Sequence, residues 1–463
     1  MIRNLFKHLI DILEGLLRQE EIWLFVFLII GLIVIPIPNL LAIILALWWL
    51  WLLLILWWAL KSLWLFWRQS IFKSETKWVM LELRMPREIS QTPQAMEQVF
   101  RSINSLRNAP GDIKEKYWEG EVTYWFALEI VSFGGQVHFY VRCRNRLKNL
   151  VEAAFFSYYK DVEVVEVDDY IDKFPTAVSE MYHNELDLWG SEMVLAKDEA
   201  FPIKTYSHFE EEEVNEKKKV LLDPMSAFLE ILGKLNKEET VGIQILIAPG
   251  DPGWAKAWEP MVEKLQRPSL IKIKGGDPEM GAREVPIMRT PAQTDILEEV
   301  ENNLSKPALD TLIRFIYLSP KATFFDSFAR RGLAGAFNQY ALLNMNSFRQ
   351  NYHVSTRTRI WNWPHVYPRV RNEYRKQRLL RNYLIREVPP ETWMGRFITS
   401  YLFNFNFASR RFKMNVEGLA TLFHPPTASV LTAPHIKRVE SRKAGPPAGL
   451  AIFGEETEIE KYR

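Results

Sequence analysis

A run of basic and aromatic residues between positions 357 and 386 is the part of this sequence best suited to bind a charged partner. Aromatic residues, among them Trp361, Trp363 and Tyr374, alternate with its cations. Such a pattern is typical of proteins that bind single-stranded nucleic acid, because cations neutralise phosphates and aromatic rings stack on bases. The candidate contacts are Arg357, Arg359, Arg369, Arg371, Arg375, Lys376, Arg378 and Arg381.

Two other interpretations of this run stay open. A basic segment on a membrane-tethered body can bind anionic lipid headgroups. A solvated helix whose aromatic side chains pack on the rest of the protein would have the same composition. The chain of 463 residues has a net charge of only +2, so its overall field does not favour nucleic acid.

The motifs that would indicate catalysis are absent from the sequence. It contains no phosphate-binding P-loop, no pair of histidines at metal-ligand spacing and no nucleophile elbow. The adjacent carboxylates Asp168 and Asp169 end an expected strand, where neighbouring side chains point to opposite faces. The single cysteine, Cys143, excludes an internal disulfide and indicates a reducing compartment. The sequence therefore favours a protein that is not an enzyme, with no cofactor and no metal.

An almost wholly apolar stretch occupies residues 22–60, ahead of the larger part of the chain. Pro36 and Pro38 interrupt it, and a helix cannot continue through such a pair. Residues 40–60 are long enough to cross a hydrocarbon layer of ~30 Å, and residues 22–35 form a shorter apolar segment. We predict two transmembrane helices within residues 20–67, joined by a tight turn at 36–39.

Basic residues lie on the outer side of both expected spans, and the turn between them carries no charge. The positive-inside rule therefore places both termini in the cytoplasm. Before the first span, residues 1–19 have the 3.6-residue apolar period of an amphipathic helix. This helix could lie in the membrane surface or pack on the cytoplasmic body. The lipid bilayer is thus the first expected partner.

Residues 75–172 carry alternating strand and helix patterns. Expected strands at 77–85, 121–132, 136–144 and 162–167 are separated by expected helices at 93–106 and 147–159. The turn Phe133-Gly134-Gly135 joins the second and third strands as a hairpin. The order β-α-β-β-α-β predicts a ferredoxin-like domain.

Residues 187–345 indicate a second ferredoxin-like unit with a helical insertion. Its expected strands lie at 191–196, 240–248 and 310–318, and its expected helices at 224–235, 254–266, 291–304 and 322–343. Asp223 is the predicted N-cap of the first of these helices. Residues 346–413 form the basic and aromatic helical region, and residues 414–463 are expected to be a Pro/Gly-rich linker. The predicted fold class is an α+β membrane protein: a transmembrane hairpin followed by tandem ferredoxin-like cytoplasmic units.

Several segments resemble the N-terminal region of bacterial HerA/FtsK-class ATPases of type IV secretion and conjugation. They are SFGGQVHFYVR at 132–142, RLKNLVE at 146–152, VDDY at 167–170, LNMNSF at 343–348, VEGLATLFHP at 416–425 and SRKAGPPAGL at 441–450. The resemblance covers about residues 75–452. In that family a P-loop domain follows the last segment, whereas this sequence ends at Arg463.

The resemblance implies a scaffold without a motor, held in the bacterial cytoplasmic membrane, on which a separately encoded ATPase docks. The implied docking tail comprises Phe423, His424, Pro425, Arg442, Lys443, Pro446 and Pro447. DNA and a second copy of the chain are further candidate partners. The alternative is a membrane-tethered protein that binds single-stranded nucleic acid through the basic run.

Overall fold

In this computed structural model, the structure describes residues 46–86, 91–212, 219–267, 270–273, 283–286, 289–342, 344–357, 365–400 and 409–427. The expected amphipathic helix, the first span and the 36–39 turn lie outside these residues. The chain divides into two compact units, residues 1–64 and 65–463.

Helix α4 (Trp48–Glu75) is the one helix of the described residues that is long and apolar enough to cross a membrane. Most of its large side chains are exposed along residues 48–64. The second span was predicted at residues 40–60 within a membrane region of 20–67, and α4 continues beyond this region to Glu75. Residues 61–75 contain neither glycine nor proline, so nothing in the backbone ends the helix earlier.

The first half of the second unit has the predicted order of elements. It comprises β1 (Trp78–Arg84), α5 (Pro93–Ser105), β2 (Phe126–Phe133), β3 (Gln136–Arg144), α6 (Lys148–Tyr158) and β4 (Glu163–Val167). The predicted hairpin between β2 and β3 is confirmed, with Phe133 opposite Gln136. Gly134 and Gly135 have φ of 55° and 88°, the left-handed conformation that this two-residue turn requires.

The second half again has four main strands, and the connections between them are longer. Its main elements are β5 (Leu186–Leu195), α8 (Ser226–Gly233), β8 (Thr240–Pro249), β11 (Ala308–Pro320) and β12 (Phe348–Gln350). Short elements lie before β8: α7 (Val178–His183) and the hairpin of β6 (Glu210–Glu212) and β7 (Lys219–Leu221). The expected insertion between β8 and β11 contains α9 (Glu259–Gln266), β9 (Leu270–Ile273), β10 (Arg283–Pro286) and α10 (Pro291–Ser305).

The helix predicted at 322–343 is shorter and irregular. Helical turns of different kinds follow one another without a break: a π-helical turn (Phe328–Leu333), α11 (Ala334–Ala336) and a 3₁₀ turn (Phe337–Tyr340). Gly332 and Gly335 lie in this stretch, and glycine inside a helix costs ~1 kcal/mol relative to alanine. These turns nevertheless bury Leu333, Phe337 and Tyr340 in the core.

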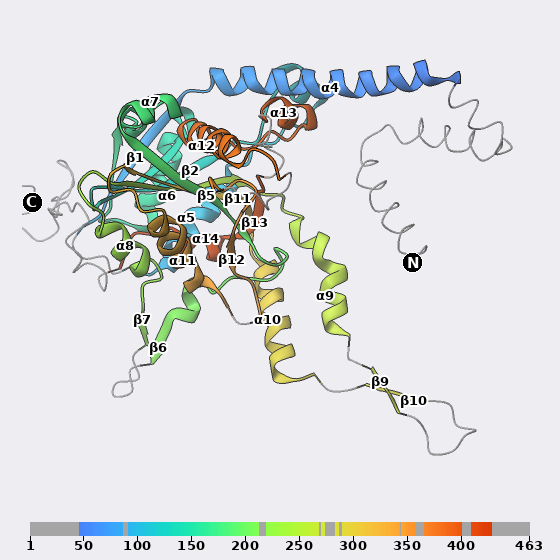
Figure 1. The fold of residues 1–463 in the computed structure, drawn as a ribbon. Coiled ribbons are helices and arrows are strands. Elements are labelled where there is room, and N and C mark those ends of the chain that lie inside the picture. The colour runs from blue at the N-terminus through green and yellow to red at the C-terminus, as the bar shows by residue number, and fades with distance from the viewer. Residues whose placement is uncertain are drawn as a thin grey trace, which may run out of the picture. The chain divides into compact units, whose positions relative to one another are not determined.

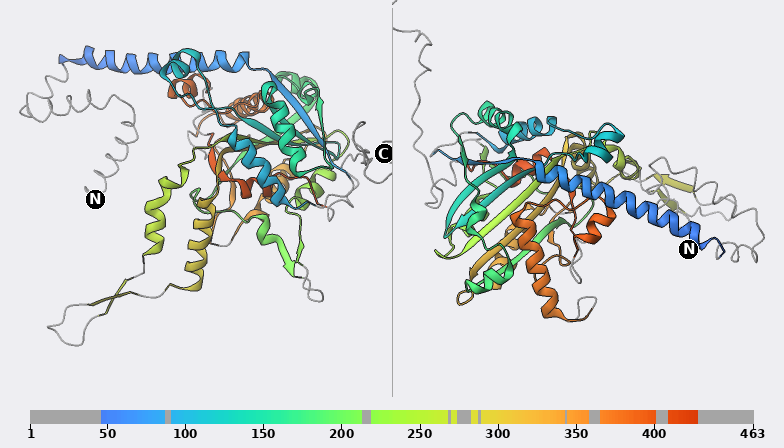
Figure 2. Two further views of the ribbon diagram at one scale, coloured as in Figure 1. Left: turned by 180° about the vertical axis from the view of Figure 1, so that it is seen from behind. Right: turned by 90° about the horizontal axis from the view of Figure 1, so that it is seen from above.

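One antiparallel sheet of nine strands organises the second unit (Figures 1 and 2). Its strand order is β12-β5-β11-β8-β2-β3-β1-β4, and β13 (Phe412–Asn415) pairs with the beginning of β11. The two halves meet where β2 pairs with β8, from Phe126 opposite Ile247 to Phe133 opposite Thr240. The sheet is therefore continuous from one half to the other.

Helices cover both faces of this sheet. Figure 1 shows α7 and α12 (Pro368–Leu384) above it and α8, α11 and α14 (Val416–Leu422) below it. The lower core contains Phe100, Phe155 and Phe228, and the upper core contains Tyr170, Leu379 and Tyr383. The central strands β2, β8 and β11 are therefore buried on both faces, whereas the edge strand β4 is partly exposed.

Residues 346–427 belong to the same packed unit as the sheet. They supply the edge strand β12, the covering helix α12, the short helix α13 (Trp393–Ile398), and then β13 and α14. The prediction that the chain is loop-like from Met414 onward is wrong for residues 414–422, because every residue of α14 is buried. Asn415 caps α14, and its side chain accepts a hydrogen bond from the Gly418 amide at 2.7 Å.

Candidate functional site

The predicted basic contacts of α12 mostly face inward. Arg371, Arg375, Lys376 and Arg378 have exposed fractions of 1–7%, because the helix lays this side on the sheet. Only Arg369 and Arg381 of the α12 cations are exposed, and Arg357, before the helix, is half-buried. Arg359 lies outside the described residues.

The inward-facing cations bind groups of the protein itself. Lys376 Nζ lies 2.5 Å from Asp187 Oδ1, and Arg378 Nη2 lies 3.3 Å from Glu387 Oε2. Arg375 donates to the backbone carbonyls of Tyr352 and Ser355, each at 3.1 Å. These cations could reach a phosphate only if α12 left the sheet. Their burial therefore contradicts the prediction that Arg371, Arg375, Lys376 and Arg378 contact nucleic acid or lipid directly.

A row of polar side chains crosses the sheet beneath α12. Residues directly opposite one another in antiparallel strands project from the same face, and the row follows five such pairings. In order across the sheet it comprises Glu82, Tyr140, Glu129, Gln244, Arg314 and Glu192. All six are buried, and the last four are fully so.

Arg386, just after α12, binds the centre of this row. Its guanidinium contacts both carboxylate oxygens of Glu129, at 2.8 and 3.0 Å, and both oxygens of Asp169, at 2.5 and 2.9 Å. Burial is the largest single influence on the pKa of Arg386 and lowers it, but the charge of Glu129 and the hydrogen bonds to Glu129 and Asp169 together outweigh burial and raise the pKa. The guanidinium therefore stays charged, and it holds the end of α12 to β2 and to Asp169, two residues after β4.

Two further contacts join α12 to the row. The Tyr170 and Tyr383 hydroxyls are 2.8 Å apart, and Arg314 donates to the carbonyl oxygens of Asn382 and Glu387. A catalytic group must touch its substrate, and Glu129, Arg314 and Glu192 are 0% exposed. The row is therefore a buried structural network that fixes α12 on the sheet.

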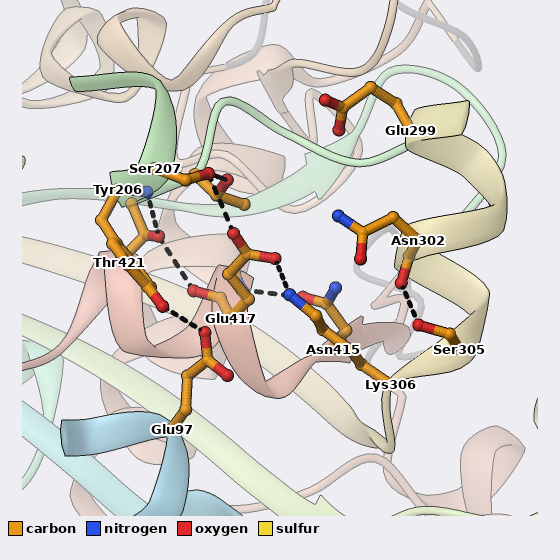
Figure 3. Close-up of polar contacts among 12 residues, drawn as sticks. Glu97, Tyr206, Ser207, Glu299, Asn302, Ser305, Lys306, Asn415, Glu417 and Thr421 are labelled. Atoms are coloured by element: carbon orange, nitrogen blue, oxygen red, sulfur yellow. Dashed lines mark hydrogen bonds and ion pairs between the residues drawn. The ribbon is translucent and has the colours of Figure 1, made fainter. Parts of the chain in front are cut away.

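A second polar cluster surrounds Glu417 of α14 (Figure 3). Lys306 Nζ lies 2.5 Å from Glu417 Oε2, and the Ser207 hydroxyl donates to Glu417 Oε1 at 3.1 Å. The neighbouring Tyr206 donates its amide to the Thr421 hydroxyl and its own hydroxyl to Glu97 of α5. The cluster thereby ties the 3₁₀ turn Tyr206–Phe209 to α14, to α5 and to the residue after α10.

Part of this cluster resembles a nucleophile, base and acid in series. Ser207 Oγ lies 3.3 Å from His208 Nδ1, and His208 Nε2 lies 3.1 Å from Glu299 Oε1. A nucleophilic serine must give its proton to the base. Here the Ser207 hydroxyl donates to Glu417, and the Thr205 hydroxyl also contacts His208 Nδ1, at 3.1 Å. The arrangement therefore favours a structural role.

The described part of the predicted docking tail is buried. Phe423, His424 and Pro425 lie in the core, and His424 Nε2 is 3.2 Å from Asp223 Oδ1. Asp223 also accepts from the Met225 and Thr427 amides, each at 2.7 Å. It was predicted as an N-cap, but α8 begins only at Ser226, and Asp223 instead joins the start of α8 to the segment after α14. Arg442, Lys443, Pro446 and Pro447 lie outside the described residues.

A hollow of about 420 Å³ lies where α4 leads into β1. It is lined by Phe72, Glu75, Thr76, Lys77, Arg144, Asn145 and Arg146. The Arg144 guanidinium lies over the Tyr124 ring, 4.1 Å from its centre. Three cations and one carboxylate line the hollow, which favours an anion. Sequence reasoning missed it because its two lining segments are far apart in the chain.

Among the described residues, no three His, Cys, Asp or Glu side chains come together in a way that could hold a metal ion. No curated protein matches the chain. Residues 68–438 match the family described as "Domain of unknown function (DUF8128)". This match begins within the C-terminal part of α4 and covers all the strands of the nine-stranded sheet. The chain therefore belongs to the DUF8128 family.

Proposed function

We propose that this protein is a membrane-anchored, non-catalytic scaffold of a type IV secretion-like or conjugative system, on which a separately encoded HerA/FtsK-class ATPase docks. One observation supports the anchor above all: α4 is a single helix that is apolar and exposed over residues 48–64 and becomes part of the packed second unit from residue 65. The role of the ATPase rests on the segments between residues 75 and 452 that resemble that class.

The scaffold consists, in this proposal, of two ferredoxin-like units fused edge to edge. The first half has the strand order β4-β1-β3-β2 and the connections β-α-β-β-α-β. The second half has the matching order β12-β5-β11-β8, with the insertion between β8 and β11. The pairing of β2 with β8 supports this arrangement, because the same strand of each unit lies at the junction.

The proposed location is a bacterial cytoplasmic membrane, crossed twice, with both termini in the cytoplasm. The apolar segment 22–35, the proline break at 36–39 and the basic residues outside both spans support this topology. The docking surface for the ATPase would be the C-terminal tail that contains Arg442 and Lys443, because Phe423, His424 and Pro425 are buried.

Co-purification tests the scaffold. The full chain would be expressed with a P-loop ATPase encoded beside it and extracted in detergent. We expect the two to elute together, and ATP hydrolysis only in samples that contain the ATPase. The variant Arg442→Glu/Lys443→Glu should weaken the complex, whereas the matched variant Arg369→Glu/Arg381→Glu on the exposed side of α12 should not. ATP hydrolysis by the chain alone would contradict the proposal.

The alternative function, single-stranded nucleic-acid binding, has weaker support, because four of its eight candidate cations lie on the buried side of α12. Charge reversal at these four would disrupt the fold, so it cannot test binding. The informative variant is Arg369→Glu/Arg381→Glu. Binding whose affinity falls steeply with salt and is lost in this variant would favour the alternative.

A further inference from the structure

Two short segments, one ending at Gly120 and one containing Gly395, contact α4 at the beginning of the second unit. Gly120 follows the π-helical turn Glu115–Glu119, and a Cβ added there would lie 2.4 Å from the backbone carbon of Arg68. A Cβ added at Gly395 of α13 would lie 2.5 Å from Cδ2 of Phe66. Both segments thus touch residues 66–69, and Figure 1 shows α13 beside the helix.

Both segments expose large apolar side chains beside this contact. The exposed fractions are 71% for Ile113, 65% for Trp118, 49% for Trp393, 57% for Phe397 and 50% for Ile398. Trp393 and Phe397 stack with ring centres 5.6 Å apart, so they form one flat apolar surface. Trp67 of α4 is itself 50% exposed. Soluble proteins scatter such side chains singly, whereas two groups of them, each in a segment that contacts residues 66–69, indicate an interaction surface.

The length of α4 indicates what covers this surface. In the topology proposed above, the residues from Leu40 to Trp67 would rise about 42 Å as a helix, which matches the ~40–45 Å thickness of a bilayer with its two interfacial layers. They contain one charged residue, Lys61, whose long side chain can extend to the headgroups. Arg68 is the next charge. Residues 66–69 would therefore lie at the membrane–water interface, the layer in which tryptophan side chains are enriched.

We propose that Ile113, Trp118, Trp393, Phe397 and Ile398 form a membrane collar that inserts into the interfacial layer of the bilayer that α4 crosses. This inference rests on the proposed membrane anchor. It depends on apolar insertion and not on charge, because the turn Glu115–Glu119 carries two glutamates beside its lysine, Lys116. The collar would hold the second unit against the lipid surface at two places beside its helix.

Site-directed spin labelling of the full chain in lipid vesicles tests the collar. Single cysteines would be introduced as Trp118→Cys and Phe397→Cys, and the labels compared for collisions with oxygen, which partitions into lipid, and with a water-soluble nickel complex. Cys143 stays unlabelled because it is buried, and burial raises the pKa of its thiol to about 12. Ile113→Cys and Ile398→Cys report on the same segments with smaller changes of side chain.

Two matched sites make the outcome decisive. Phe325 is 62% exposed and follows β11, whose other end, at Asp310, lines a small hollow with Gln69 of α4 and Trp125. A label at Phe325→Cys should therefore report water. Leu53→Cys in α4 should report lipid. We expect oxygen-to-nickel ratios at 118 and 397 several-fold above that at 325.

Ratios at 118 and 397 equal to that at 325, with a lipid-like ratio at 53, would overturn the collar and leave the anchor intact. A water-like ratio at 53 would overturn the anchor and the collar together.

Discussion

At the scale of single residues, Arg386 is a buried cation that joins α12 to the sheet. It binds Glu129 at the centre of the sheet and Asp169 after β4, and it is 1% exposed. A buried ion pair is not in itself strongly stabilising, but removal of one partner leaves the other charge buried and unpaired. A variant that removes one partner should therefore be less stable than a variant that removes both.

Arg386→Met should lower the free energy of unfolding by about 3–5 kcal/mol, because the buried Glu129 carboxylate would lose its cation, although the hydrogen bond from Gln244 would remain. The double variant Arg386→Met/Glu129→Gln should recover part of that loss. Denaturant or thermal unfolding of the detergent-solubilised full chain measures both. Arg369→Met, on the exposed side of α12, is the control and should change stability by less than about 0.5 kcal/mol. Equal effects of the two single variants would contradict this role of Arg386.

The carboxyl group of Glu82 should make the free energy of unfolding depend on pH in the acid range. A hydrogen bond to His138 lowers its pKa to about 2; burial opposes this, and Arg84 adds to it. A carboxyl whose pKa is lower in the folded state stabilises the fold above its unfolded pKa of about 4.3. That contribution should be lost as the pH falls from about 4.5 towards 2.

Measured across this range, the stability of Glu82→Gln should fall less with pH than that of the unaltered chain. Glu238→Gln, at an exposed carboxylate, serves as the comparison and should leave the slope unchanged. A slope in Glu82→Gln as steep as that of the unaltered chain would remove Glu82 as its source.

At the scale of elements, α12 depends on glycines in the strands beneath it. A Cβ added at Gly242 of β8 would lie 1.8 Å from the Tyr383 hydroxyl oxygen, and one at Gly190 of β5 would lie 2.5 Å from Leu379 Cδ2. Tyr383 can therefore approach β8 only where the strand has no side chain. This contact also leaves the Tyr383 carbonyl in place to accept from Gln244 Nε2, at 2.9 Å.

Gly242→Ala should destabilise the full chain by about 1–3 kcal/mol, because an added carbon in a packed core forces the helix to shift. Gly335→Ala is the matched control, since a Cβ there meets nothing within 4 Å. It should be neutral or slightly stabilising, since alanine favours the helical backbone. Thermal unfolding distinguishes the two, and a Gly242→Ala chain as stable as Gly335→Ala would show that the helix yields without cost.

The parts of the fold that could be predicted from the sequence are those in which the local pattern of residues matches the burial of those residues in the folded protein. The hairpin of β2 and β3, the apolar stripe of α5 and the extent of β8 follow from turn glycines and periodicity. The orientation of α12 could not be read in this way, because buried arginine and lysine side chains are rare and a basic helix ordinarily faces solvent. The signal that could have helped was the buried charge in the strands themselves, Glu129, Glu192 and Arg314. α14 was missed because it is short and followed by prolines.

At the scale of the whole molecule, the remaining question is topology. We predict that a cysteine placed in the 36–39 turn, as Ile37→Cys, reacts with a membrane-impermeant thiol reagent added to intact cells. The reason is that, in the proposed topology, the basic residues outside both spans would keep the termini in the cytoplasm and the turn outside. Cys143 needs no replacement, because it is fully buried in β3. The unaltered chain is therefore the control and should stay unlabelled. Reaction of Ile37→Cys only after lysis would contradict the two-pass arrangement.

If the gene were divided between the two halves of the sheet, the pairing of β2 with β8 would be lost within each product. A break in the connection between β4 and β5 would produce two polypeptides, each with a long bare strand where its neighbour used to be. Such strands carry unpaired backbone donors and acceptors and readily recruit another chain. Made separately, the pieces should aggregate. Made together, they should find each other and reassemble, which would turn this family into a source of split reporters.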